Sequence, residues 1–209
     1  MKLTKEQLFL FVAEERKRQK ITEVDDWYLV ALARVESGLI VGRISRRQTG
    51  SKNAYTKEEV LRYGIPGECQ RRGGGLYQIT PVAWQTYFAE TKDGTSPMML
   101  FDQTDFGAEY QTRVGLFCYR KALAAVRVRP AIVAASGSPQ FAAWADAIYA
   151  RGSGALDLAI ARVQSLGLPV TLSRVLQALP DNGENTAFHG EVVAATARAY
   201  RAGTNPPSP

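Results

Sequence analysis

Cysteine and histidine are scarce in this 209-residue chain, which has two cysteines and one histidine. Cys69 and Cys118 lack the Cys-x-x-Cys spacing of a zinc site, and a single histidine gives them little help as a ligand. Two cysteines are also too few for a disulfide framework. We therefore expect two buried free thiols and no zinc site.

Long apolar runs are also lacking. No stretch approaches the roughly 20 apolar residues that a membrane-spanning helix needs, so we expect no transmembrane segment. Residues 1–6 (MKLTKE) become charged at once and lack the apolar core of a Sec signal peptide. The sequence thus predicts a protein made in the cytoplasm, which must leave by another route if it acts outside.

The composition is that of a globular protein, with 45% hydrophobic and 22% charged residues. A disordered or collagen-like chain is therefore excluded. The formal net charge is +6. Such a charge favours polyanionic partners such as nucleic acid, anionic lipid or bacterial cell wall, but it is equally compatible with simple solubility.

Helix signals recur along nearly the whole chain. Thr4 and Thr56 each begin a capping box, and Thr80 precedes a proline that suits a first helical turn. We expect one all-α domain of about eight helices over residues 1–202, no β-hairpin, and a disordered proline-rich tail over 203–209. The stretch 42–72, rich in arginine and lysine, is expected to be largely irregular, with one short helix after Thr56.

Three short segments carry chemically informative residues. The first is residues 33–38 (ARVESG), where Glu36 stands at the end of an apolar helix, just before a glycine turn. A carboxyl group that apolar residues partly shield has a raised pKa and can act as a general acid near neutral pH. Taken alone, this short motif is a weak signal, and a surface glutamate explains it better than a catalytic one.

The second segment is residues 73–81 (GGGLYQITP). Its glycines permit a close approach of ligand to backbone, while Tyr77 and Gln78 offer a flat ring and a hydrogen-bonding amide suited to sugars. A phosphate cradle assisted by Arg71 and Arg72 is the competing interpretation. The segment lacks the preceding strand and the Gly-Lys-Ser/Thr ending of a P-loop.

The third segment is residues 147–156 (AIYARGSGAL), in which Tyr149 closes a helix before a glycine turn. Together and in this order, the segments resemble the lytic transglycosylase domain of the soluble lytic transglycosylase type, related to goose-type lysozyme. That family has a Glu-Ser pair, then Gly-Leu-Met-Gln-Ile/Leu with a proline just after, then Ala-Tyr-Asn-Ala-Gly-Pro-Gly. The corresponding residues here are Glu36-Ser37, residues 75–81 and residues 149–154. The resemblance covers roughly residues 25–161, with 100–110 similar to the family's intermediate helix, and implies a lysozyme-like fold.

The chain departs from the family pattern in several places. Tyr77 replaces methionine, and the third segment keeps its tyrosine and two glycines but has Ala150 in place of asparagine. Glu36 and Gly75 are 39 positions apart, which is longer than the family's usual spacing. The extra length is the basic segment 42–72, either a surface lobe that grips the wall or closes over the cleft, or a solvated insertion.

The resemblance implies cleavage of the β-1,4 bond between N-acetylmuramic acid and N-acetylglucosamine in peptidoglycan. Glu36 would protonate the leaving oxygen and then deprotonate the C6 hydroxyl, which closes a 1,6-anhydro ring. The acetamido group of the substrate would stabilise the anomeric centre, an exception to the two-carboxylate scheme. Tyr149 would orient Glu36, and no metal or organic cofactor is needed. The residues expected to line the glycan cleft are Ser37, Gly75, Tyr77, Gln78 and Ile79.

Two other functions stay open at this point. A lysozyme-type muramidase needs a second carboxylate about 6.5–9.5 Å from the acid, and Asp93, Asp102 and Asp105 are the candidates. A non-catalytic structural protein of a virion or secretion complex would keep the fold alone. The expected partners are peptidoglycan glycan strands and other virion or secretion-complex proteins, with no specific nucleic acid. Without an export signal, we expect delivery to the cell wall in a phage virion or as an endolysin.

Overall fold

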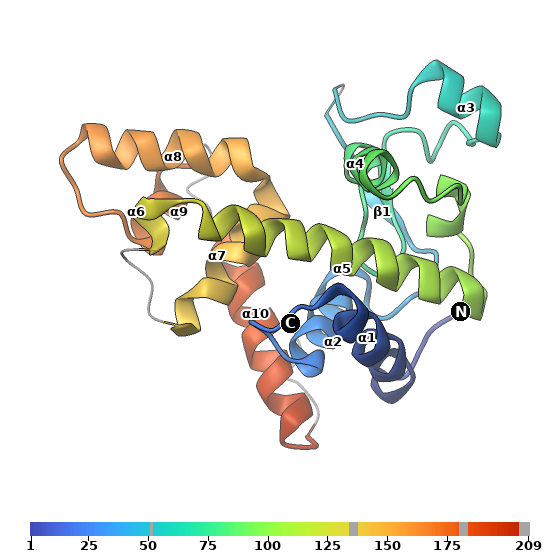
Figure 1. The fold of residues 1–209 in the computed structure, drawn as a ribbon, viewed down its shortest axis with the longest axis horizontal. Helices are drawn as coiled ribbons and strands as arrows, with labels where there is room; N and C mark the ends of the chain where they lie inside the picture. Colours follow the sequence, from blue (N-terminus) through green and yellow to red (C-terminus); the bar gives the residue numbers. More distant parts are fainter. Residues whose placement is uncertain (51, 134–137, 180–183, 205–209) are drawn as a thin grey trace. The chain divides into compact units, whose positions relative to one another are not determined.

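The computed structural model describes residues 1–50, 52–133, 138–179 and 184–204. Their secondary structure is mostly helical (Figure 1). The described α-helices are α1 (Lys5–Gln19), α2 (Asp26–Ser37), α3 (Lys57–Tyr63), α4 (Pro81–Thr91), α5 (Asp105–Arg127), α6 (Pro130–Val133), α7 (Ser138–Arg151), α8 (Ser153–Ser165), α9 (Leu172–Gln177) and α10 (Glu184–Arg201). A 3₁₀ helix, η1 (Pro97–Leu100), and two strands, β1 (Ile44–Gln48) and β2 (Arg72–Gly74), complete them. The prediction of an all-α fold of about eight helices is confirmed.

The predicted capping residues begin their helices. The Thr4 hydroxyl accepts a hydrogen bond from the Gln7 amide at 3.1 Å, and the Gln7 side chain accepts one in return. Thr56 forms the same reciprocal pair at the start of α3, which ends at Gly64 with φ of 62°. Thr80 caps α4, with Pro81 as its first residue. Each cap satisfies backbone donors that a helix start leaves unbonded.

The stretch 42–72 is more regular than expected. β1 pairs antiparallel with β2, with Ile44 opposite Gly74 and Gln48 opposite Arg72 and an irregularity between them. We expected no β-hairpin, and this small antiparallel pair, which is not a tight hairpin, was not predicted. The two strands are short and are separated by residues 49–71, which include α3, so neither a tight-turn signature nor a long alternating pattern marks them in the sequence.

The chain divides into two compact units. Unit 1 comprises Met1–Lys20 and Leu29–Cys118, and unit 2 comprises Ile21–Tyr28 and Tyr119–Pro209, so the boundary falls inside α2 and inside α5. The expectation of a single domain over residues 1–202 stays a prediction. Residues 205–209 of the expected tail lie outside the described residues.

In unit 1, an aromatic cluster packs residues of the stretch 42–72 against α4. Trp84 of α4 is completely buried, and its indole N–H donates to the Tyr110 hydroxyl at 2.9 Å. The rings of Tyr55 and Tyr63 meet Trp84 edge-on, each with a centroid separation of 5.8 Å. These contacts attach the segment around α3 to α4. Such edge-to-face pairs add stabilisation beyond that of apolar burial.

Unit 2 packs α7 against α8 and α10. Trp144 of α7 is fully buried, and Asp146 on the same helix is 1% exposed. The Asp146 carboxylate accepts a 2.5 Å hydrogen bond from the Tyr28 hydroxyl.

Both predicted thiols are free, with Cys69 buried and Cys118 half-buried. Among the helices described here, none has the length together with the apolar character that crossing a bilayer demands.

Candidate functional site

The predicted acid, Glu36, lies in the last turn of α2, and its side chain is half-buried. The preceding residues Leu32 and Ala33 are completely buried and fix the helix in unit 1. Gly38 follows in a left-handed conformation, with φ of 70°, as the glycine turn predicted. The carboxyl group is therefore carried on a firmly packed helix end.

Ser37, beside the acid, is fully buried. Its hydroxyl donates to the carbonyl oxygen of Ala33 at 3.0 Å, one helical turn back. The hydroxyl thus serves the helix end, and the predicted contact of Ser37 with a glycan has no support from its placement. The carbonyl oxygen of Ser37 accepts a hydrogen bond from the Arg43 guanidinium at 2.5 Å.

Arg43 joins two of the motif segments. While its side chain reaches Ser37, its own carbonyl oxygen accepts hydrogen bonds from the Gly75 amide at 2.9 Å and from the Gln78 side-chain amide at 3.1 Å. The structure therefore brings the Glu36-Ser37 pair and the glycine-rich segment together within unit 1. Arg43 was not predicted as a site residue because it is one of many cations in the stretch 42–72.

The backbone from Gly74 to Ile79 forms a tight turn. The amides of Gly74 and Ile79 each donate to the other residue's carbonyl at 2.9 Å, and the Gln78 side chain donates to the Gly75 carbonyl at 2.9 Å. Gly75 and Gln78 both adopt left-handed backbone angles, with φ of 79° and 50°. A non-glycine residue in this region costs of order 1–3 kcal/mol, and such strain clusters at functional sites. Gln78 is half-buried, so it is the predicted binding residue of this turn that keeps access to solvent.

The three consecutive glycines are explained by close packing. A Cβ atom would lie 2.7 Å from the Gln78 carbonyl oxygen at Gly73, 2.6 Å from the Phe101 ring at Gly74 and 2.6 Å from the Gln111 side chain at Gly75. The amide of Gly74 donates to Ile79, and that of Gly75 donates to Arg43. Since these amides are already used, the phosphate-cradle interpretation is not supported.

Gln111 of α5, which was not predicted as a site residue, connects the segment at Gly42 with the glycine-rich turn at Leu76. It is completely buried, and its side-chain oxygen accepts from the Gly42 and Leu76 amides, each at 3.1 Å. Its nitrogen donates to the carbonyls of Met99 at 3.0 Å and Asp102 at 2.8 Å. The signal in the sequence is a lone amide three residues after Ala108 and three before Val114, on the buried face of a long helix.

Tyr77 and Ile79 point into the core instead of towards a ligand. They are 1% and 2% exposed, and the Tyr77 hydroxyl donates to the Leu29 carbonyl at 3.2 Å. Burial raises the pKa of the Tyr77 hydroxyl well above its ordinary value. The ring fits against Gly115 of α5, where a Cβ atom would approach the ring to 2.3 Å. The predicted platform for a sugar is thus a core residue, because a glycine on a neighbouring helix opens a slot for it.

Tyr149 lies on α7 in unit 2 and is half-buried. Its ring centroid is 6.0 Å from that of Tyr119. Glu36 belongs to unit 1, and the predicted action of Tyr149 on it stays a prediction. Tyr149 is thus held by aromatic packing on a described helix, which is compatible with a positioning role.

The candidate second carboxylates have local structural roles. Asp93 accepts hydrogen bonds from the Tyr87 hydroxyl at 2.5 Å and the Thr95 amide at 3.0 Å, and the Arg113 guanidinium lies 3.6 Å away. Burial opposes ionisation of Asp93, but these hydrogen bonds and Arg113 outweigh it, so its pKa lies below the ordinary value.

The other two candidates stand at the start of α5. The Asp102 carboxylate accepts from the Thr104 amide at 2.7 Å, in the turn that leads into the helix. Asp105 is exposed in the first turn, where a negative charge suits the helix N-terminus. Within the described residues, no group of three or more His, Cys, Asp and Glu side chains is arranged to hold a metal ion.

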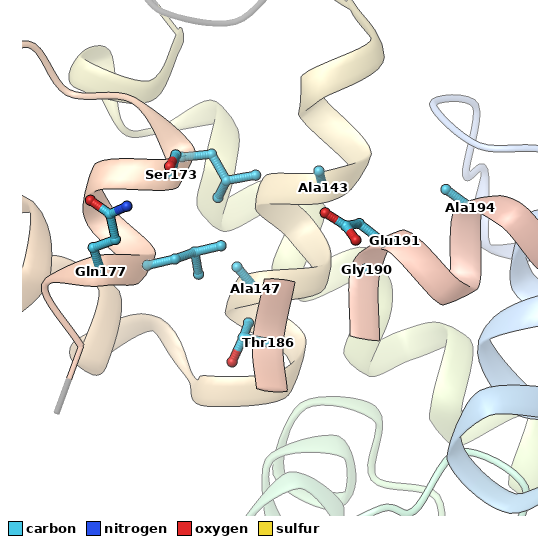
Figure 2. A pocket seen from close by; sticks show the side chains of 10 residues that line it. Ala143, Ala147, Ser173, Gln177, Thr186, Gly190, Glu191 and Ala194 are labelled. Atoms are coloured by element: carbon cyan, nitrogen blue, oxygen red, sulfur yellow. The ribbon is translucent and has the colours of Figure 1, made fainter. Parts of the chain in front are cut away.

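Unit 2 contains a cavity of about 680 Å³ between α7, α9 and α10 (Figure 2). Small residues of α7 and α10 form much of its wall, and the Glu191 side chain turns its carboxylate towards the Ala143 side. The lining residues are Ala143, Ala147, Leu172, Ser173, Leu176, Gln177, Thr186, Gly190, Glu191 and Ala194. They include none of the predicted site residues.

A scan against protein-family models finds no family that matches the chain, and a search of curated proteins finds no match.

Proposed function

We propose that this protein is a lytic transglycosylase that cleaves the β-1,4 bond between N-acetylmuramic acid and N-acetylglucosamine in peptidoglycan. The observation that carries the proposal is the double link made by Arg43, which ties Ser37 to Gly75 and Gln78. The segments that resemble the family's acid and its glycan-binding turn are 39 positions apart in the sequence, yet they share these hydrogen bonds.

A single carboxyl group at position 36 is sufficient for the reaction. Protonated Glu36 donates its proton to the glycosidic oxygen as the bond to C1 breaks, and the acetamido oxygen of the substrate stabilises C1. The resulting carboxylate then takes the proton of the C6 hydroxyl as its oxygen bonds to C1. Glu36 ends protonated, no water is consumed, and the product ends in 1,6-anhydro-N-acetylmuramic acid.

The predicted site residues have three roles in this proposal. Gln78 faces the glycan from the strained turn, since it is half-buried and not enclosed. Ser37, Tyr77 and Ile79, all buried, hold the helix end and the turn in place. Tyr149 orients Glu36, as the family resemblance implies.

The engagement of two of the three candidate aspartates, Asp93 and Asp102, supports a transglycosylase over a muramidase, and the exposed Asp105 is the candidate that stays open. An inverting hydrolase needs a carboxylate that is available to activate water. Asp93 is engaged by Tyr87, Thr95 and Arg113. The Asp102 carboxylate in turn accepts from Thr104. We therefore expect Asp93→Asn and Asp102→Asn to retain glycan cleavage.

The test is mass spectrometry of the products from purified peptidoglycan, with wild type, Glu36→Gln and Glu109→Gln. Glu109 is an exposed glutamate of α5 in the same unit, so its substitution controls for loss of a carboxylate. We expect wild type and Glu109→Gln to release muropeptides lighter by one water than hydrolysed ones, and Glu36→Gln to release none. Reducing ends would identify a muramidase, and undiminished turnover by Glu36→Gln would refute the assignment of Glu36.

A further inference from the structure

The basic lobe, defined as residues 42–72, holds nearly all of the chain's net positive charge. It contains eight arginines and lysines and three glutamates, for a net +5 of the total +6. Lysine and arginine in the rest of the chain are almost balanced by aspartate and glutamate. Charge that is concentrated in one segment attracts ligands of the opposite sign to that segment. Solubility alone does not require such a concentration.

The lobe is a folded platform. β1 pairs with β2, and α3 is closed by a capping box at Thr56 and by Gly64 (Figure 1). The side-chain amide of Gln85 on α4 donates to the Glu59 carboxylate at 2.7 Å, and Tyr63 packs edge-on against Trp84. The backbone that carries its charges is therefore ordered, which lowers the entropy that a ligand must remove on binding.

The described cations of the lobe have no carboxylate partner within ion-pair distance. Elsewhere in the chain arginines form ion pairs, as Arg129 does with Asp157 and Arg201 with Asp25. Among the lobe cations whose side chains are described, none forms an ion pair. Three of them donate to backbone carbonyls instead, namely Arg43 to Ser37, Arg71 to Thr49 and Arg72 to Ser45.

The three glutamates of the lobe balance only three of its eight cations. The Glu59 carboxylate is occupied by the Thr56 amide and by Gln85. Among the lobe cations whose side chains are described, the exposed ones are Arg46, Lys52, Lys57, Arg62 and Arg71. Guanidinium and ammonium groups that face solvent in this way recognise carboxylates and phosphates.

The lobe is continuous with the candidate site. Arg43, its second residue, makes the contacts that connect Ser37 with Gly75 and Gln78. β2 begins at Arg72, the last residue of the lobe, and leads directly into Gly75. The lobe is thus joined to the candidate site at both of its ends and belongs to the same unit.

We propose that the basic lobe binds carboxylates of the peptide stems carried by the peptidoglycan strand whose sugar lies at Glu36. This inference rests on the proposed function. A peptidoglycan strand repeats these carboxylates on the same polymer as the scissile bond. Charge complementarity and the continuity of the lobe with the site therefore favour the peptide stems of the bound strand as the ligand of the lobe. The lobe then selects peptide-bearing strands over bare glycan.

The test measures binding of soluble, uncross-linked peptidoglycan strands, labelled at the reducing end, before and after an amidase removes their peptides. Amide hydrolysis leaves one lactyl carboxylate on each muramic acid, so the comparison removes the stem carboxylates and keeps this one in their place. All variants carry Glu36→Gln, so that binding is read without cleavage. The lobe variant combines Arg46→Gln, Lys52→Gln and Lys57→Gln, exposed residues with no contact that holds the fold. The control variant combines Lys2→Gln, Lys17→Gln and Arg162→Gln, exposed residues elsewhere that remove the same charge.

We expect the parent protein to bind peptide-bearing strands roughly tenfold more tightly than bare strands at low salt, as rim charges typically tune binding. The control variant keeps this preference and the lobe variant loses it. In 1 M salt, where the screening length is about 3 Å, the preference disappears. A lobe variant that keeps the preference, a control variant that loses it equally, or a parent that shows none would each overturn the inference.

Two further outcomes separate the inference from its alternatives. If duplex DNA displaces the strand from the parent but not from the lobe variant, the lobe recognises phosphate polymers, and the carboxylate assignment is wrong. If the lobe variant loses binding as expected while wild type releases no product from any peptidoglycan, the proposed function fails and the recognition of peptide stems stands.

Discussion

The Arg43 guanidinium donates a hydrogen bond to the carbonyl oxygen of Ser37 at 2.5 Å. This bond fixes the end of α2 one residue after Glu36, while the Arg43 carbonyl receives the Gly75 amide and the Gln78 side chain. The side chain of one residue thus holds the acid's helix and its backbone holds the turn. Since Arg43 belongs to the basic lobe, the start of that segment is part of the candidate site.

Removing this side chain should disturb the acid more than the fold. We expect Arg43→Ala to lower kcat on bare glycan strands by roughly 10- to 100-fold, because a hydrogen bond to a charged donor contributes about 1.5–3 kcal/mol. KM should change less, and Arg43→Lys should recover part of the rate because its ammonium still donates. Arg71→Ala, which removes a similar bond to Thr49 further from Glu36, is the control. Equal losses in both variants would contradict the positioning role.

Replacing the Gln111 side chain should strongly lower the free energy of unfolding of the protein. Gln111→Leu leaves two buried amides and two carbonyls without their partners, so we expect a loss of about 3–5 kcal/mol in the free energy of unfolding. Gln111→Glu restores the acceptor but places a carboxylate against the carbonyls of Met99 and Asp102, and it should also destabilise. Gln164→Ala, at an exposed site of α8, should change stability by less than about 0.5 kcal/mol. Denaturant unfolding measures all three, and a Gln111→Leu value near that of Gln164→Ala would refute the bridging role.

Tyr77 and Gly115 should be energetically coupled. The added methyl of Gly115→Ala would meet the Tyr77 ring, so we expect a loss of about 1–3 kcal/mol from overpacking. Tyr77→Met, which introduces the residue typical of the family, should relieve most of this loss. A double-mutant cycle measures the coupling and subtracts the separate cost of Tyr77→Met. Gly154→Ala, where nothing lies within 4 Å, is the control and should be tolerated. Additive effects of the two substitutions would contradict the packing described.

Local signals predicted most of the helices. Thr56 with Glu59, Thr80 with Pro81, and Gly38 act within one or two turns of chain, so their hydrogen bonds and backbone angles follow from neighbouring residues. The first two motif segments share hydrogen bonds through Arg43, and their role as one site stays a prediction. These features depend on short sequence separations, which a pattern can record.

The long-range contacts were not predicted, for physical reasons. Gln111 is 35 positions from Leu76, and nothing in either segment encodes their contact. The β1–β2 pair joins short strands across α3. Tyr77 was expected at the surface because an aromatic ring beside glycines suits a sugar, whereas the glycine that accommodates it, Gly115, lies on another helix. Burial is decided by such partners, so the chemical type of a residue indicates what it can do and not where it points.

Asp93 should make unit 1 sensitive to acid. Its folded pKa lies below the ordinary 3.8, so its ionised form stabilises the fold above that pH, and this contribution is lost as the pH falls through the folded pKa. We expect Asp93→Asn to be less stable than wild type at neutral pH and to lose less stability between about pH 4 and 2. Tyr87→Phe removes one donor and should raise the pKa of Asp93, which carboxyl ¹³C NMR reads directly. Parallel stability curves for wild type and Asp93→Asn would contradict this assignment.

Tyr149 should affect the rate without affecting the fold. We expect Tyr149→Phe to lower kcat on purified peptidoglycan by roughly tenfold, the value of one hydrogen bond of about 1.4 kcal/mol to the acid, because the ring keeps its packing against Tyr119. If Tyr149 acts through the acid, as proposed, the acidic limb of the pH–rate profile should shift in the variant as well. Tyr63→Phe, at a half-buried tyrosine of α3, controls for removal of a hydroxyl and should leave both rate and profile unchanged. An unaltered rate in Tyr149→Phe would remove Tyr149 from the site, whereas a lower rate with an unshifted profile would assign it to the substrate and not to Glu36.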